Sequence, residues 1–231
     1  MQRRYFLAGI LILFALSPLA AGDVANFVNL GFSNDSSVFM FGQYGIINGE
    51  EQPYAGIYTV DVPRNRFISQ GVLEKTYKND LQPGQDGMGA LFNLLHQAEA
   101  LVDRYKIDHL ANGRIVYIHL DGDKPKERIE FRDFVRGDAY ILTLVQQSFG
   151  AEESVSASFH INLSITSRSG STSTYTLGLP DYRREKVMRY RIKAVFFSPD
   201  ESGLVVIVEK EVWSEEGTNI RFMVETTPLG S

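Results

Sequence analysis

The chain has 231 residues, including 23 Lys or Arg, 28 Asp or Glu and no cysteine. The lack of cysteine excludes disulfides, a thiol nucleophile, thiolate metal sites and a lipid-modified cysteine. The mildly acidic balance gives no electrostatic reason to expect nucleic acid or an anionic lipid surface as a partner.

The N-terminal segment predicts a secretion signal. Residues 2–4 are a short basic start, residues 5–16 an apolar run of 12 residues, and residues 17–22 a small-residue end. The run is too short to span a bilayer as a stop-transfer helix. We therefore expect a signal peptide at 1–22 with cleavage before Asp23, and a periplasmic or secreted protein that has no membrane span after signal removal.

The remaining segment, residues 23–231, carries 21 basic and 28 acidic residues in a length of 209. That length favours a single domain with a substantial core. An exported domain without disulfides has to rely on its packed core, which favours a bacterial periplasm or cell exterior over a eukaryotic secretory route.

Short strands dominate the prediction, beginning with residues 27–30, 38–41 and 57–61. One later segment differs, because apolar side chains recur every three or four residues from Met88 to Tyr105. That spacing predicts one amphipathic helix near 86–106. Its apolar stripe is expected to pack on a sheet, since no basic fringe of the kind found on membrane-surface helices flanks it.

Two antiparallel hairpins are expected in the middle of the chain. The first pairs residues 114–120 with 128–134 and is followed by a strand at 140–146. The second pairs residues 154–166, where apolar and polar side chains alternate, with 174–179. Alternation of this kind is typical of a strand with one buried and one solvated face.

An internal repeat links the two ends of the chain. Phe32-Ser33-Asn34-Asp35 matches Phe197-Ser198-Pro199-Asp200 at a separation of 165 residues, within similar units at 27–61 and 192–226. Ser and Asp side chains hydrogen-bond nearby backbone to shape a turn, and Pro presets its dihedral angle.

This Phe-Ser-Pro-Asp pattern resembles the blade motif of bacterial periplasmic β-propellers of the TolB type, over about 35 residues at each end. Residues 62–186 contain no further copy and hold the expected helix, so a closed propeller of six or seven blades does not fit. The expected fold is mainly β, with antiparallel meanders and hairpins and one helix. An open or two-sheet architecture and a small propeller-like one both stay open, and the end units could pair with each other.

The stretch from Phe27 through Gly42-Gln43-Tyr44-Gly45 to Tyr58 also resembles a bacterial family of predicted secreted proteins of unknown function, known from spirochaetes among others. The resemblance covers nearly all of the segment after the predicted signal. It implies export and a bacterial origin, and it brings no activity, cofactor or catalytic residue with it.

Motifs of known catalytic and metal sites are not apparent. The four histidines, at 96, 109, 119 and 160, have no metal-site spacing, and Asp121-Gly122-Asp123 with Glu127 reads better as a hairpin turn than as a calcium loop. No catalytic residue, metal or cofactor is predicted. Paired carboxylates for glycoside cleavage stay open, because they need proximity in space and not in sequence.

The best candidate contact surface is the loop region at 42–54, which combines glycines, Gln43, Tyr44 and Tyr54, together with Trp213 in the matching loop of the second unit. If the end units lie side by side, these side chains could form one binding rim. The alternative is that the aromatic rings cover the sheet ends as packing.

These observations favour a non-catalytic binding module of the bacterial envelope, with a protein, a peptide or another envelope component as its partner. Two alternatives stay open. One is a glycan-directed envelope hydrolase with spatially assembled carboxylates, and the other is a structural partner in an envelope assembly.

Overall fold

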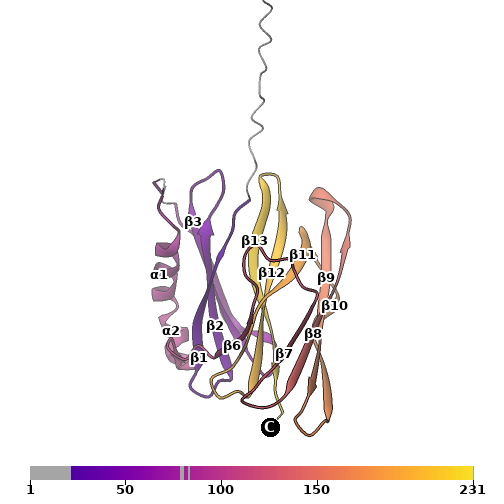
Figure 1. The fold of residues 1–231 in the computed structure, drawn as a ribbon. Coiled ribbons are helices and arrows are strands. Elements are labelled where there is room, and N and C mark those ends of the chain that lie inside the picture. Colours follow the sequence, from indigo (N-terminus) through magenta and orange to yellow (C-terminus); the bar gives the residue numbers. More distant parts are fainter. Residues whose placement is uncertain (1–21, 79–80, 83, 231) are drawn as a thin grey trace, which may run out of the picture.

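A computed structural model describes residues 22–78, 81–82 and 84–230. Within them, three antiparallel sheets and two short helices stack as four layers (Figure 1). The helices pack on the first sheet, the first sheet on the middle sheet, and the middle sheet on the third sheet. The prediction of a mainly β, antiparallel and open architecture is confirmed.

The first sheet has the strand order β4-β3-β2-β1-β5. Its strands are β1 (Asn26–Ser33), β2 (Val38–Ile46), β3 (Pro53–Asp61), β4 (Arg66–Thr76) and β5 (Ile107–Asp108). The first four form a meander in which each strand pairs with the next.

The middle and third sheets interleave along the chain. The middle sheet has the order β13-β12-β11-β6, with β6 (Arg114–Ile118), β11 (Val187–Phe197), β12 (Gly203–Ser214) and β13 (Gly217–Pro228). The third sheet has the order β10-β9-β8-β7, with β7 (Arg128–Arg132), β8 (Ala139–Phe149), β9 (Ser156–Thr166) and β10 (Thr172–Glu185). A short 3-10 turn, η1 (Glu152–Ser154), connects β8 to β9.

Strand β12 is buried on both faces. Val205 and Ile207 pack toward the first sheet, whereas Leu204, Val206 and Val208 pack toward the third sheet. Successive side chains of a strand point to opposite faces, so an uninterrupted apolar run needs a covered sheet on each side. The sequence of β12 therefore accounts for the three-sheet stack.

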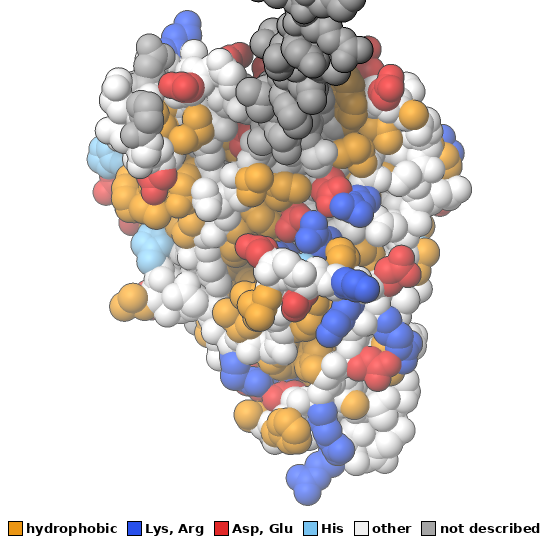
Figure 2. All heavy atoms as spheres, turned by 45° about the horizontal axis from the view of Figure 1, so that its top comes forward, with side chains coloured by type: hydrophobic (Ala, Val, Ile, Leu, Met, Phe, Trp, Pro, Cys, Tyr) orange, Lys and Arg blue, Asp and Glu red, His pale blue; other side chains and the backbone are white. Residues whose placement is uncertain are grey.

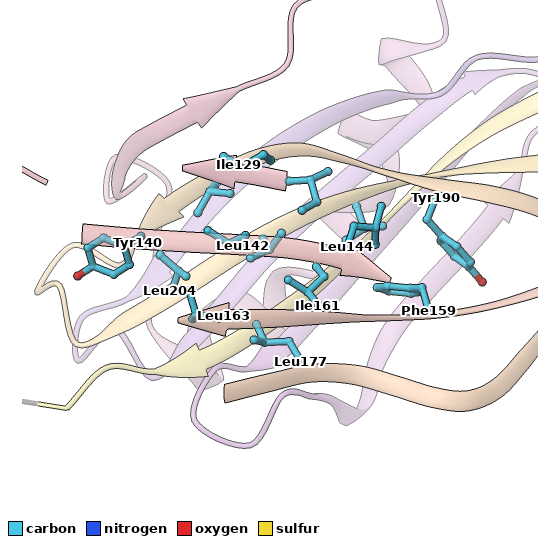
Figure 3. Packing of buried hydrophobic residues seen from close by; sticks show 14 of the residues in the cluster. Ile129, Tyr140, Leu142, Leu144, Phe159, Ile161, Leu163, Leu177, Tyr190 and Leu204 are labelled. Atoms are coloured by element: carbon cyan, nitrogen blue, oxygen red, sulfur yellow. The ribbon is translucent and has the colours of Figure 1, made fainter. Parts of the chain in front are cut away.

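Figure 3 shows the core between the middle and third sheets, where Leu142 of β8, Ile161 and Leu163 of β9, and Leu204 of β12 meet. All four side chains are almost completely buried. The core between the first and middle sheets is more aromatic, as Phe39 shows with ring centroids 4.7 to 6.0 Å from three other phenylalanines. Close-packed layers of this kind hold the sheets in a fixed arrangement.

The predicted helix near 86–106 is present as two helices, α1 (Met88–Gln97) and α2 (Glu99–Tyr105). The break is at Ala98, which is buried and has φ −87° and ψ 1°. No Pro or Gly marks this position in the sequence. The change of direction lets apolar side chains of both helices contact the same twisted sheet.

The predicted hairpin between residues 114–120 and 128–134 is wrong. Strand β6 pairs with β11 in the middle sheet, and β7 pairs with β8 in the third sheet. Each segment forms the expected strand, but the connection between them crosses from one sheet to another. The hairpin of β9 and β10 is confirmed, with Leu177 opposite Ile161.

The repeated turns at the two ends share one hydrogen-bond pattern. Asp35 accepts hydrogen bonds from the hydroxyls of Ser33 and Ser37, at 2.6 and 2.8 Å. Asp200 accepts the equivalent bonds from Ser198 and Ser202, at 2.7 and 2.8 Å. The turns are also neighbours in space, since the backbone N–H of Asp200 donates to the hydroxyl of Ser36 at 3.4 Å.

Candidate functional site

A groove of about 650 Å³ opens between the first and middle sheets, on the side where β1 and β6 lie. We call it the inter-sheet groove. Its lining comes from the N-terminal segment, β1, β6, the loop after β6, β11, β12 and β13, namely Val24, Ala25, Asn26, Phe27, Asn29, Ile115, Ile118, Asp121, Gly122, Arg191, Lys193, Ala194, Phe196, Ile207, Glu209, Ile220 and Phe222.

The groove opens where β1 loses its outer neighbour. Strand β5 pairs with β1 only at Phe32 and Ser33, because a bulge between Asn29 and Gly31 turns the strand. Gly31 has φ 101°, and a Cβ there would lie 2.1 Å from the carbonyl oxygen of Asp108, so glycine is required for this close approach. Among the strands of the described residues, β6 pairs with β11 alone. Two partly unpaired strand edges therefore flank the groove.

The floor of the groove is apolar. Phe196, Ile207 and Phe222 are buried members of the core between the first and middle sheets, and the groove reaches down to them. On the β6 side, Ile115 and Ile118 are 63% and 54% exposed. Exposed β-branched side chains beside an apolar floor form a surface suited to apolar ligands or partners.

A charged cluster on β11 and β12 forms one wall. Arg191 contacts Glu209 at 2.8 Å and Glu211 at 3.1 Å through the same guanidinium nitrogen, and its other terminal nitrogen lies 3.3 Å from Nε2 of His119. Both glutamates are buried. Buried carboxylates need such partners, since an unpaired buried charge is very costly. Arg189 lies 2.5 Å from Glu211 as well, so two arginines balance the charge of the two glutamates.

A second ion pair on this wall is more accessible. Lys193 lies 2.5 Å from Asp121, whose side chain is 93% exposed. The Lys193 hydrogen bond lowers the pKa of Asp121. An exposed pair contributes little stability, so Lys193 can exchange this carboxylate for one from a ligand. On the face shown in Figure 2, acidic and basic side chains gather in the centre between hydrophobic patches.

The four residues predicted to form a binding rim lie outside the groove lining. Gln43 is buried: its side-chain N–H donates to the Tyr58 hydroxyl at 2.7 Å, and its oxygen accepts from the backbone N–H of Phe222 at 2.9 Å. Tyr44 is buried in the core between the first sheet and the helices. Burial raises the pKa of the Tyr44 hydroxyl, and the charge of Asp86 adds to this effect.

Tyr54 and Trp213 are partly buried. The Tyr54 hydroxyl donates to the carboxylate of Asp23 at 2.9 Å, and its ring lies 4.6 Å from the Arg221 guanidinium carbon. Trp213 is 5.9 Å from the amine of Lys186. Gln43 and Tyr54 line one cavity together, which is smaller than the groove and lies at the opposite side of the sheets. Binding by these four residues stays a prediction.

A pattern of charged residues in the sequence indicates the charged wall of the groove. Arg189, Arg191 and Lys193 interrupt an apolar strand at every second position, and Glu209 and Glu211 interrupt its neighbour in the same way. In the structure Arg191 is opposite Glu209, and Arg189 is opposite Glu211. Opposite charges at matching positions of two adjacent apolar strands indicate a polar site on a buried sheet.

Within the part of the chain that the structure describes, no three His, Asp or Glu side chains are grouped as metal ligands. Asp121 and Asp123, which the sequence left as weak calcium candidates, are exposed. None of the described helices has the length and apolar character needed to cross a membrane.

Comparison with known proteins places the chain in a family without defining its activity. No curated protein and no solved structure matches it. A family model described as "Predicted secreted protein (DUF2259)" matches residues 40–227, which reach five of the six strands of the two repeated end units and include everything between them. The chain therefore belongs to this family of predicted secreted proteins.

Proposed function

We propose that this protein is a non-catalytic binding module of the bacterial envelope that holds an extended segment of a partner protein or peptide in the inter-sheet groove. The observation that carries the proposal is the apolar groove beside the unpaired edge of β6. An extended peptide can add a strand to such an edge, with its alternate side chains entering the groove.

The dimensions support a short segment. Strand β6 has five residues, so at about 3.3 Å per residue its edge can pair with a segment of roughly five residues. Every second side chain of that segment would face the groove, over Phe196 and Ile207. Lys193 at the rim favours an acidic side chain in the partner, in exchange for Asp121. The expected ligand is an extended peptide with alternating apolar residues and one carboxylate.

The groove chemistry favours binding over glycan hydrolysis. The two acidic residues of the groove lining are Glu209 and Asp121, and both are held in ion pairs, Glu209 by Arg191 and Asp121 by Lys193. Hydrolysis with two carboxyl groups requires one of them to be protonated as the acid. The Lys193 hydrogen bond lowers the pKa of Asp121, which disfavours the protonated form that an acid catalyst needs, so this pair does not suit hydrolysis.

The test uses a defined probe and a matched variant. Seven-residue peptides with alternating Val and Thr and one central Glu are titrated against the protein by fluorescence polarisation. Ile118→Lys on the β6 edge should weaken binding at least tenfold. Leu179→Lys is the control. Leu179 is exposed to a similar degree, 59% against 54% for Ile118, but it lies on β10, an edge strand of another sheet.

Hydrogen exchange on the native protein gives an independent result. Bound peptide should slow exchange of backbone amides in β6, because they gain hydrogen-bond partners. Equal binding by the Ile118 and Leu179 variants, or unchanged exchange in β6 at peptide saturation, would overturn the strand-addition proposal. A photo-cross-linker at Ile118 then identifies the natural partner in intact envelopes.

A further inference from the structure

A second cavity lies between the first and middle sheets, at the β13 and β4 side rather than the β6 side. It has a volume of about 330 Å³. We call it the lysine cavity, and it is lined by Gln43, Ile47, Tyr54, Ala55, Gly56, Tyr58, Glu74, Thr76, Lys210 and Arg221. Unlike the inter-sheet groove, it is surrounded mainly by polar and charged side chains.

A hydrogen-bond chain fixes the first-sheet wall of this cavity. Gln43 donates to the Tyr58 hydroxyl at 2.7 Å, and that hydroxyl donates to Glu74 at 2.5 Å. Burial raises the pKa of Tyr58, and the hydrogen bond to Glu74 adds to this increase. The hydroxyl therefore stays protonated at neutral pH. The only acidic side chain in the lining, Glu74, is thus already engaged by a donor.

The opposite wall brings positive groups together. The ion pairs formed by β12 and β13 join Glu209 and Glu211 to arginines of β11 and join Arg221 to Asp23. Among the residues that the structure describes, no ion pair includes Lys210. Burial lowers the pKa of Lys210, and the charges of Arg184 and Arg221 add to the decrease, against the opposing effect of Glu74.

Arg184 extends this positive region. Its Nη1 atom is buried and has no hydrogen-bond partner among the described residues. Leaving a buried charged donor without a partner is costly. Arg184 lines a neighbouring cavity, whereas Lys210 and Arg221 line the lysine cavity itself, and Arg221 is already paired with the Asp23 carboxylate.

We propose that the lysine cavity is a binding site for a small anion bearing a carboxylate or phosphate group, with Lys210 as its main contact and Arg221 beside it. An anion there would give Lys210 an ion pair that the described part of the chain does not supply. Charge-assisted hydrogen bonds from ammonium and guanidinium groups are the usual recognition of such ligands. This site is separate from the inter-sheet groove, so either proposal can fail alone.

The first experiment is calorimetric titration of the protein with inorganic phosphate and, separately, with succinate. Proton uptake on binding of either anion should increase as the pH is raised, because the anion stabilises the charged form of a lysine whose pKa lies below its ordinary value. Stronger binding of one probe identifies whether the site prefers phosphate or carboxylate. Absence of binding by both at 10 mM would overturn the proposal.

Two variants locate the site. Lys210→Met keeps the length of the side chain and removes its charge, and it should weaken anion binding at least tenfold. Lys186→Met is the control, because Lys186 is exposed and lies outside the cavity. Equal binding by both variants would contradict the assignment of Lys210.

A measurement on the unchanged protein covers the case in which Lys210→Met does not fold. Acetic anhydride reacts with uncharged amines, so an anion that stabilises the charged form of Lys210 should slow acetylation there. Mass spectrometry reports acetylation at Lys210 and at Lys186 in the same sample. Protection at Lys210 alone supports the site, whereas equal rates with and without the anion argue against it.

Discussion

The ion pair of Asp23 offers the sharpest test of how the N-terminal segment is held. The Asp23 carboxylate lies 2.6 Å from the Arg221 guanidinium and accepts a hydrogen bond from the Tyr54 hydroxyl at 2.9 Å. Its side chain is 3% exposed, and that of Arg221 is 24% exposed. The Asp23→Ala substitution removes both interactions but keeps the backbone bonds that Asp23 forms with Asn219 and Ile220.

The expected cost follows from burial. Removing one member of a buried ion pair costs about 3–5 kcal/mol. Because Arg221 can regain some water, we expect the lower end, about 3 kcal/mol, which corresponds to a decrease in Tm of roughly 6–12 °C for a protein of this size. Urea unfolding of a protein that begins at Asp23 measures this free energy directly.

The control is Glu130→Ala. Glu130 lies 2.6 Å from Arg128, so the distance matches, but these side chains are 59% and 55% exposed. An exposed pair contributes about 0–1 kcal/mol. If Asp23→Ala costs no more than Glu130→Ala, burial of this ion pair does not hold the N-terminal segment, and the reasoning is refuted.

Three further predictions concern buried carboxylates and the repeated turns. Burial raises the pKa of Glu225, so its ionisation destabilises the fold as pH rises above about 4.5, and Glu225→Gln should gain stability relative to the native protein between about pH 4.5 and 7 in urea titrations. Burial opposes ionisation of Asp133, but the Arg114 hydrogen bonds prevail and lower its pKa. The native protein should therefore lose stability as pH falls below about 4, and Asp133→Asn should lose less over that range. Asp35→Ala and Asp200→Ala should each cost about 1–2 kcal/mol, and a cost from only one of them would show that the two turns are not energetically equivalent.

Local sequence patterns predicted where the strands lie better than which strands pair with each other. Alternation identified β9, and both strands of the incorrect hairpin exist as β6 and β7. A turn-forming loop between two strand patterns is compatible with a hairpin or with a crossing to another sheet. Strand pairing is decided by long-range packing. Here β6 takes the open edge of β11, and β7 takes the open edge of β8. The break at Ala98 has the same origin, since only the twist of the underlying sheet requires it.

The candidate sites were harder to predict because no single segment contains them. The inter-sheet groove combines residues from Val24 to Phe222, and the lysine cavity combines Gln43 with Lys210 and Arg221. Loop composition pointed to aromatic residues, yet Tyr44 and Gln43 are buried as packing and hydrogen-bonding groups. The more informative signal was charge inside apolar strands, because such charges persist only where partners or a site accommodate them.

The N-terminal segment connects the two proposed sites. Val24 lines the inter-sheet groove, and Arg221, which holds Asp23, lines the lysine cavity. Loss of the Asp23 carboxylate therefore releases one wall of the groove and frees one cation of the cavity. Asp23→Ala should weaken peptide binding in the groove, because that wall loses its anchor, and it should strengthen phosphate binding, because Arg221 loses its competing anion. Opposite changes in the two affinities would show that the residue following the predicted cleavage site controls both, whereas unchanged affinities would show that the ion pair serves stability alone.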